Sequence, residues 1–128
     1  MRTIIAGSRH ITSSLAVMEA FDSCPFDVTE IVSGGCKGVD ALGEKIAKTN
    51  KIPHKRFPAD WDNLEAPGAQ IKSGPFGKYN AAAGRDRNEQ MAVYAEALIL
   101  VWDGLSSGSA DMRRRAKKHG LLIHEVIV

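Results

Sequence analysis

Short apolar runs alternate along the chain with segments in which apolar residues recur at helical spacing. Apolar runs of this length predict buried strands, and the run at 97–102 is the most apolar of them. Pro53 favours an edge position for the third run, because proline cannot donate a hydrogen bond to a neighbouring strand. The predicted strands are Arg2–Ala6, Val28–Val32, Ile52–Phe57, Ala97–Trp102 and Leu121–Val128.

The segments between these runs predict four helices. Thr12 or Ser13 is placed to cap the first helix, and Gly120 is placed to end the last one in the left-handed conformation. The predicted helices run from the cap to Asp22, from Gly38 to Thr49, from Asp86 to Glu96 and from Ala110 to His119. The residues predicted to face inward are Leu15, Met18 and Phe21 or Ala16 and Ala20 in the first helix, and Val39, Leu42, Ile46 and Ala47 in the second.

Residues 58–84 show little periodicity and are rich in proline and glycine. A segment this long without regular structure is unusual in a small domain and is commonly functional or mobile. We therefore expect a long functional or mobile loop between the third strand and the third helix.

Strands that alternate with helices predict a mostly parallel sheet with helices on both faces. The simplest topology with right-handed crossovers is a Rossmann-like, three-layer α/β/α domain with a five-stranded sheet in the order 3-2-1-4-5. The length of 128 residues predicts that 1–128 form a single domain.

Composition argues against several classes of protein, including disulfide scaffolds, zinc proteins and membrane proteins. The net charge of +2 gives no chain-wide electrostatic argument for nucleic acid. Cys24 and Cys36 form neither a disulfide scaffold nor a zinc motif, so we expect a cytoplasmic protein without a metal site. No run has the length of a membrane span and the first residues lack the pattern of a signal peptide, so no membrane partner is expected.

Three loops rich in glycine and serine each follow a predicted strand and precede a helix. In a parallel sheet, such loops open at the carboxyl ends of the strands, where ligands bind beside the point at which strand order reverses. Glycine lets backbone N–H groups approach an anion closely, and a helix N-terminus adds positive potential. The three loops together therefore predict a phosphate-binding crevice, although plain turn geometry would also explain the glycines. The loop residues that we expect to bind the ligand are Gly7, Ser8, Arg9, Ser33, Gly34, Gly35, Lys37, Gly38, Asp103, Gly104, Ser107, Gly108 and Ser109.

The second loop matches neither of the two standard phosphate motifs. Lys37 is followed by Gly38 rather than by serine or threonine, so the loop is not a P-loop, and its glycines do not follow the dinucleotide pattern. ATP hydrolysis and a standard NAD site are therefore not predicted, and no cofactor is required.

Several charged side chains are candidates for the same crevice, each with a plainer alternative. Arg9 would clamp a phosphate or form a surface ion pair, and Asp40 would accept ribose hydroxyls or stabilise a helix start. Arg85, Arg87 and Asn88 open a helix against its dipole, which favours contact with phosphate or base over a solvated ion pair.

Other residues have weaker arguments. Asp103 and Asp111 would act as acid and base or bind ribose, and the alternative for Asp111 is stabilisation of a helix N-terminus. Cys36 has no histidine assigned to it as a catalytic partner. His10 is a loop neighbour of the crevice, and Trp61, Phe76 and Tyr79 would either stack on a base or pack the long loop. The basic residues of the last helix form a solvated face or a nucleic-acid stripe, and they are Arg113, Arg114, Arg115, Lys117 and Lys118.

Five motifs resemble the YspA-related branch of the SLOG superfamily, in order and over nearly the whole chain. They are Gly7-Ser8-Arg9, the loop from Ser33 to Asp40, Pro58-Ala59-Asp60-Trp61, the segment from Gly84 to Met91 and the segment from Gly108 to Met112. The superfamily includes the LOG phosphoribohydrolases and the DNA-processing protein DprA. The resemblance implies a Rossmann-like sheet, a ligand of the nucleotide type and a homo-oligomer, a dimer or larger. Many branches are regarded as sensors or processors of nucleotides, often beside phage-defence systems.

The LOG enzymes cleave a nucleoside monophosphate between base and ribose. Their catalytic arginine falls on Arg87, but their glutamate falls on Met112, and the nearest carboxylate is that of Asp111. Neighbouring helical residues point about 100° apart, so Asp111 would aim elsewhere than the glutamate.

The leading hypothesis is thus a protein that binds a nucleotide or an NAD- or ADP-ribose-like derivative of unknown identity. Arg87 and Asp111 would be its catalytic residues if it also hydrolyses an N-glycosidic bond as a nucleoside 5′-monophosphate phosphoribohydrolase does. The alternatives are a DNA-binding accessory protein of DprA-like fold and an oligomeric module that sequesters its ligand without catalysis.

Overall fold

The five predicted apolar runs pair into one parallel sheet. The computed structural model describes residues 1–128 and places in this sheet β1 (Arg2–Gly7), β2 (Glu30–Ser33), β3 (His54–Arg56), β6 (Ala97–Trp102) and β7 (Leu122–Ile127). Every neighbouring pair is parallel, and Ile4 of β1 lies between Val32 of β2 and Leu98 of β6. The predicted α/β class with a mostly parallel five-stranded sheet is confirmed.

The order across the sheet is β3-β2-β1-β6-β7. It differs in detail from the predicted 3-2-1-4-5, because two further strands precede β6 along the chain and lie outside the sheet. These are β4 (Ile71–Gly74) and β5 (Gly77–Asn80), which pair with each other in an antiparallel hairpin. β3 lies at an edge of the sheet, as Pro53 indicated.

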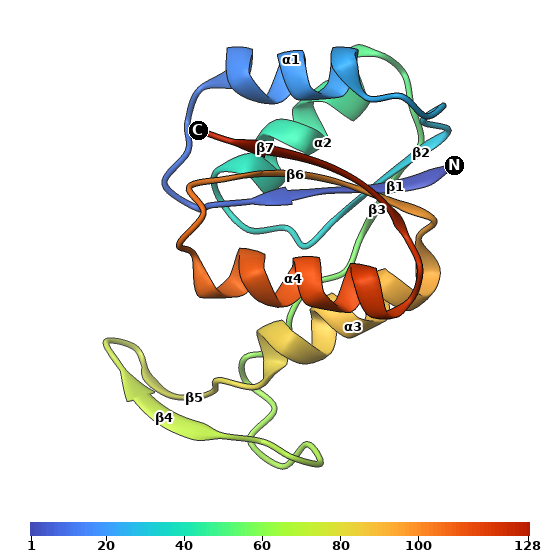
Figure 1. Ribbon diagram of the computed structural model, residues 1–128. Helices are drawn as coiled ribbons and strands as arrows, with labels where there is room; N and C mark the ends of the chain where they lie inside the picture. The colour runs from blue at the N-terminus through green and yellow to red at the C-terminus, as the bar shows by residue number, and fades with distance from the viewer.

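The hairpin corrects the prediction of an irregular loop over 58–84. Figure 1 shows it projecting from the body of the molecule below α3 (Ala83–Tyr94), whose first residues also belong to the predicted loop. These strands could not be predicted from the sequence because Gly74, Pro75 and Gly77 interrupt the alternation of apolar and polar residues that indicates a strand. Those same residues make the turn of the hairpin.

The other helices are α1 (Ser14–Ser23), α2 (Val39–Thr49) and α4 (Ser107–Lys118). α1 and α2 lie over one face of the sheet, and α3 and α4 lie over the other (Figure 1). Ser13 caps α1 as predicted, while α3 and α4 begin three residues earlier than predicted. None of the helices combines the length and the apolar character that crossing a membrane requires.

The central strands β1 and β6 are buried on both faces. Ile4 and Leu98 face a core shared with α3 and α4, whereas Ile5 and Ile99 face a core shared with α1 and α2. Strands covered on both sides read as continuous apolar runs, which explains why 97–102 predicted a strand so clearly.

The inward face of α1 differs from the first of the two predicted sets. Val17 and Ala20 are buried, while Leu15 is 64% exposed and Met18 is 49% exposed. The helix therefore contacts the sheet through small side chains, and its longer apolar side chains reach solvent. In α2, the predicted residues Val39, Ile46 and Ala47 are buried, and Leu42 packs against them.

Close packing of α2 on β1 depends on Gly43. A Cβ atom there would lie 2.8 Å from both Cβ and Cγ2 of Ile5, a fully buried residue of β1. We expect Gly43→Ala to lower the free energy of unfolding by about 1–3 kcal/mol, because overpacking outweighs the better helix propensity of alanine. Denaturant unfolding measures this change.

The matched control is Gly108→Ala, in the first turn of α4. A Cβ atom there would meet no other atom within 4 Å. This variant should unfold within about 0.5 kcal/mol of the wild type, as surface substitutions usually do. Equal stability of all three proteins would show that α2 tolerates the extra methyl group.

Candidate functional site

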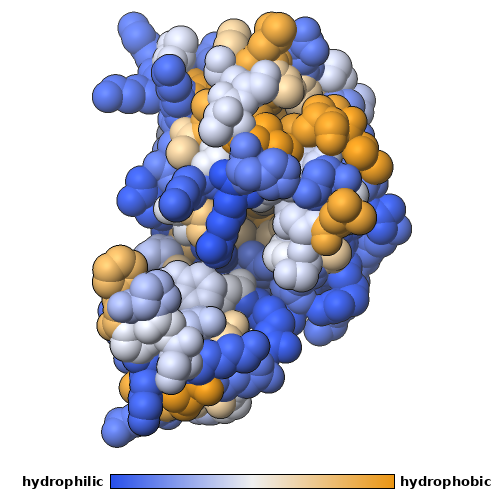
Figure 2. Space-filling view, turned by 90° about the vertical axis from the view of Figure 1, so that its left-hand side faces the viewer, coloured by the Kyte–Doolittle hydropathy of each residue, from blue (hydrophilic) through white to orange (hydrophobic).

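A cavity of about 800 Å³ lies at the carboxyl end of β1, beside the N-termini of α3 and α4 and the β4–β5 hairpin. Figure 2 faces this side of the molecule and shows a hollow between the lower lobe, which holds the hairpin, and the larger body above it. In an open parallel sheet, this is the end and the place at which ligands bind.

The cavity brings together residues from the first and third predicted loops and from the start of α3. The predicted site residues that line it are Gly7, Arg9, Asp40, Arg85, Arg87, Asn88, Ser107, Gly108, Ser109 and Asp111. His10, Cys36 and Trp61, which had weaker arguments, also line it.

The N-terminus of α4 forms one wall of the cavity. Ser106 caps the helix, because its hydroxyl oxygen accepts a hydrogen bond of 3.3 Å from the N–H of Ser109. The N–H groups of Ser107 and Gly108 have no acceptor within the helix, since the first turn of any helix leaves its donors unpaired. The wall is therefore a set of hydrogen-bond donors at the positive end of a helix dipole.

Arg87 is a buried cation that joins α3 to the loop after β2. Its side chain donates a hydrogen bond of 2.6 Å from Nη1 to the carbonyl oxygen of Gly34 and one of 3.1 Å from Nε to Oδ1 of Asn88. Its Nη2 lies 3.6 Å from Sγ of Cys36. A Cβ atom at Gly34 would lie 2.2 Å from Nη1, so the glycine makes room for the guanidinium rather than for a ligand.

Asp111 is fully engaged by neighbouring donors. Its carboxylate accepts hydrogen bonds from Asn88 Nδ2 at 3.0 Å, from Arg115 Nε at 2.9 Å and from Arg114 Nη2. Two guanidinium groups neutralise this carboxylate, so it is not available as a free base. Met112, at the position where the LOG enzymes carry glutamate, is fully buried against Met91 and Ala116.

Asp40 is the other acidic side chain in the lining. It is 6% exposed, and one of its carboxylate oxygens accepts a hydrogen bond of 3.3 Å from the N–H of Cys36. Burial raises the pKa of Asp40 to about 6, against the opposing effects of that hydrogen bond and of the nearby Arg87 charge. The carboxyl group is thus protonated in a substantial fraction of molecules near pH 6.

The charge of the lining is mainly positive. Asp40 and Asp111 are opposed by the side chains of Arg9, Lys72, Arg85, Arg87 and Arg114. With two helix N-termini close by, the cavity is suited to an anion.

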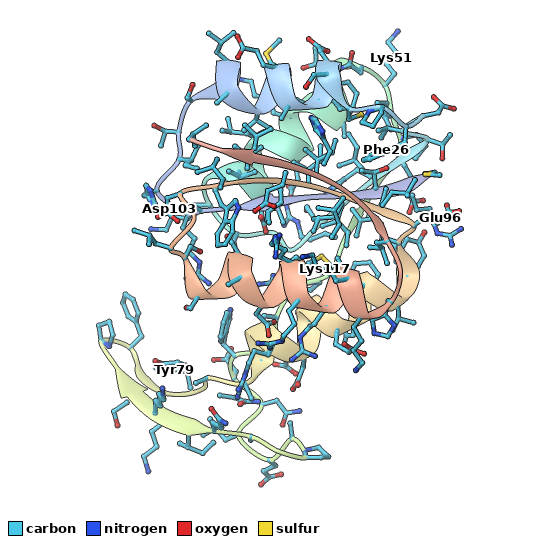
Figure 3. All side chains as sticks on the ribbon, viewed as in Figure 1. Phe26, Lys51, Tyr79, Glu96, Asp103 and Lys117 are labelled. Carbon is cyan, nitrogen blue, oxygen red and sulfur yellow. The ribbon has the colours of Figure 1, made fainter.

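Other predicted residues build the loops without lining the cavity. The hydroxyl oxygen of Ser8 accepts a hydrogen bond of 3.2 Å from the N–H of Asp103 and so joins the first loop to the third. The carboxylate of Asp103 accepts hydrogen bonds from the N–H groups of Leu105 and Ser106, which lower its pKa. Figure 3 shows Asp103 at the carboxyl end of β6, on the side of the sheet where the cavity lies.

The loop after β2 lies mostly behind the cavity. The Ser33 hydroxyl donates a hydrogen bond of 2.7 Å to Glu44 and lies 3.0 Å from Nε2 of His54. Gly38 has a φ of 75°, and a Cβ atom there would lie 2.6 Å from the carbonyl oxygen of Ser8. The remaining predicted residues outside the lining are Gly35, Lys37 and Gly104.

The contribution of the hairpin to the cavity lining was not predicted from the sequence. Gln70 and Lys72 line the cavity, and Arg9 reaches the same side, with its guanidinium carbon 5.9 Å from the ring centroid of Trp61. Ser106 and Arg114 were not expected in the lining either. The glycines that flank Pro75 and Phe76 were the one signal for a hairpin in this segment.

The basic residues of α4 are largely paired with acids. Arg113 binds Glu125 at 3.0 Å, and Arg115 binds both Asp111 and Glu89. Lys118 lies 3.9 Å from Glu89. The helix therefore presents much less free positive charge than its sequence indicates.

The raised pKa of Asp40 predicts a pH dependence of stability. A carboxyl group with a higher pKa in the folded chain than in the unfolded chain favours folding when protonated, so stability falls as pH rises from about 4 to 6. Asp40→Asn removes this titration. We expect the variant to gain about 2 kcal/mol relative to the wild type between pH 4 and pH 7, as measured by denaturant unfolding.

Asp62→Asn, at an exposed position, is the control and should follow the wild-type pH profile. Parallel profiles for wild type and Asp40→Asn would contradict the assignment of the titration to Asp40.

Comparisons with known proteins bear on the N-terminal part of this site. No curated protein and no solved structure matches the chain. Residues 1–63 match the model of the YspA, cpYpsA-related SLOG family. The matched segment contains several residues of the cavity lining, among them Gly7, Arg9, Asp40 and Trp61. The resemblance to the YspA-related branch of the SLOG superfamily is therefore confirmed for residues 1–63.

Proposed function

We propose that the cavity binds a nucleotide or a nucleotide-derived ligand through its phosphate. The observation that supports this proposal is the convergence of a helix N-terminus and several cationic side chains on one cavity of about 800 Å³. This volume lies within the range of small-molecule sites. We also propose that the fold is Rossmann-like, with three layers and the ligand at the reversal of strand order.

The first turn of α4 is the proposed phosphate site. The N–H groups of Ser107 and Gly108 lack helical partners, and the space beside Gly108 is open. Neither a positive φ nor packing within the chain requires glycine at this position. Close approach of a ligand to the backbone does explain it.

Arg85 supplies unpaired charge at the rim of the cavity, and Arg114, which is paired with Asp111, adds a second guanidinium group there. Both are more exposed than Arg87, and Arg85 lies in the first turn of α3. A guanidinium group can donate two parallel hydrogen bonds to a phosphate, which adds directionality to the attraction. Arg87 then acts mainly as the fixed support of the neighbouring loop, through its hydrogen bond to Gly34.

The proposal concerns binding rather than cleavage. Asp111 is engaged by Asn88, Arg114 and Arg115, and Met112 occupies the place of the LOG glutamate. Hydrolysis of an N-glycosidic bond by the LOG route requires a free carboxylate at this place, and the chain offers none there.

A charge-removal variant tests the phosphate site. We expect Arg85→Gln to weaken binding of adenosine 5′-monophosphate by about tenfold, because a charge-assisted hydrogen bond contributes about 1.5–3 kcal/mol. Isothermal titration calorimetry at fixed salt measures the affinity. Adenosine, which has no phosphate, should bind far more weakly to the wild type.

Lys117→Gln is the control, because it removes one exposed charge from α4 away from the cavity lining. It should leave the affinity unchanged. Absence of binding by nucleoside monophosphates, ADP-ribose and ribose 5-phosphate would refute the proposed function. Equal losses in the two variants would mean that general charge, and not the cavity, binds the anion.

A further inference from the structure

Trp61 and the start of the hairpin form a part of the cavity lining that differs chemically from the α4 N-terminus. Trp61, Gln70 and Lys72 line it, and we call these three residues the hairpin wall. The α4 side offers serine hydroxyls and backbone N–H groups, whereas the hairpin wall offers a large aromatic ring beside an amide and an ammonium group. The two sides therefore suit different parts of one ligand.

The ring of Trp61 is held in place from several directions, and the guanidinium carbon of Arg9 lies over one of its faces, 5.9 Å from the ring centroid. Tyr79 of β5 meets it edge to face, with ring centroids 6.4 Å apart and planes at 71°. Gly84 lies against it so closely that a Cβ atom would be 2.9 Å from Cη2 of the indole. Figure 3 shows Tyr79 on the hairpin, at a distance from the sheet. A ring that is fixed before binding loses little conformational entropy when a ligand stacks on it.

Asn80 fixes the backbone around the ring. Its N–H donates a hydrogen bond of 2.6 Å to the carbonyl oxygen of Trp61, and its side-chain oxygen accepts hydrogen bonds from the N–H groups of Gln70 and Ala82. Asn80 is 1% exposed. One buried amide thus sets the positions of Trp61, of the hairpin base and of the start of α3.

The polar side chains of the hairpin wall are not used within the chain. The hydrogen bonds of Gln70 involve its backbone, which leaves its side-chain amide with a donor and an acceptor for a ligand. An aromatic face with an adjacent amide is the combination that recognises a nucleobase, by stacking and by hydrogen bonds to the base edge.

We propose that the hairpin wall is a nucleobase subsite, in which the base stacks on Trp61 and its edge contacts Gln70. This inference rests on the proposed function, which places the phosphate at the α4 N-terminus. With both subsites, the cavity would bind intact nucleotides more tightly than sugar phosphates or inorganic phosphate.

Comparison of two ligands separates the subsite from the phosphate site. Adenosine 5′-monophosphate carries base and phosphate, whereas ribose 5-phosphate carries only the sugar phosphate. We expect the wild type to bind the nucleotide at least tenfold more tightly by calorimetry, because stacking of one base on an aromatic side chain has an effect of this size.

Trp61→Leu should remove most of this preference while leaving the affinity for ribose 5-phosphate within about twofold. Phe76→Leu is the matched control, since Phe76 is a fully exposed aromatic residue at the tip of the same hairpin and lies outside the lining. It should keep the preference for the nucleotide.

Tryptophan fluorescence provides a second measurement that does not depend on a destabilising variant. The chain has two tryptophans, and Trp102 is buried in the core and donates a hydrogen bond to Glu125. The nucleotide, but not ribose 5-phosphate, should quench the wild type, and Trp61→Phe should retain binding but lose the quenching. Equal affinity of the wild type for the two ligands, or unchanged quenching in Trp61→Phe, would overturn the subsite alone. Failure of both ligands and of ADP-ribose to bind would refute the proposed function instead.

Discussion

The buried guanidinium of Arg87 connects the parts of the site that come from distant segments of the chain. It extends from α3 to the carbonyl oxygen of Gly34 after β2, and it also contacts Asn88, which bonds to Asp111 on α4. A buried cation is costly unless its donors are paired, so this set of contacts must form together. The positions of both helix N-termini at the cavity therefore depend on one side chain.

Much of the sheet could be predicted from the sequence because its strands are buried on both faces. The run at 97–102 coincides with β6, and Pro53 correctly indicated an edge position for β3. The hairpin was missed because its strands are short, exposed and interrupted by glycine and proline, so no core residues gave them a pattern. The starts of α3 and α4 were placed late. No side chain caps α3, whose N-cap is Ala82, and the serines and glycine around the Ser106 cap of α4 were interpreted as part of a loop.

The residue types of the site could be predicted from the sequence, but which of them line the cavity and which support its loops could not. The glycines at 7, 34 and 38 make room for neighbouring backbone and for Arg87, which a sequence cannot distinguish from making room for a ligand. Pairing of the α4 arginines with Glu89 of α3 and Glu125 of β7 was also not predictable, since those partners come from other elements. Gly108, by contrast, faces open space, and only the structure separates it from the other glycines.

The arrangement around Asn80 has a consequence for how such proteins can diversify. The hairpin leaves the body near Trp61 and returns at Asn80, and its tip projects away from the sheet and the helices (Figure 1). Insertions, deletions or replacements in the tip would therefore leave the buried strands and the α4 N-terminus intact. Exposed loop tips are the places where chains tolerate such changes best. A fixed end at the α4 N-terminus, with the anion site proposed for it, joined to an exchangeable appendage would let one scaffold evolve new ligand preferences without the loss of its fold.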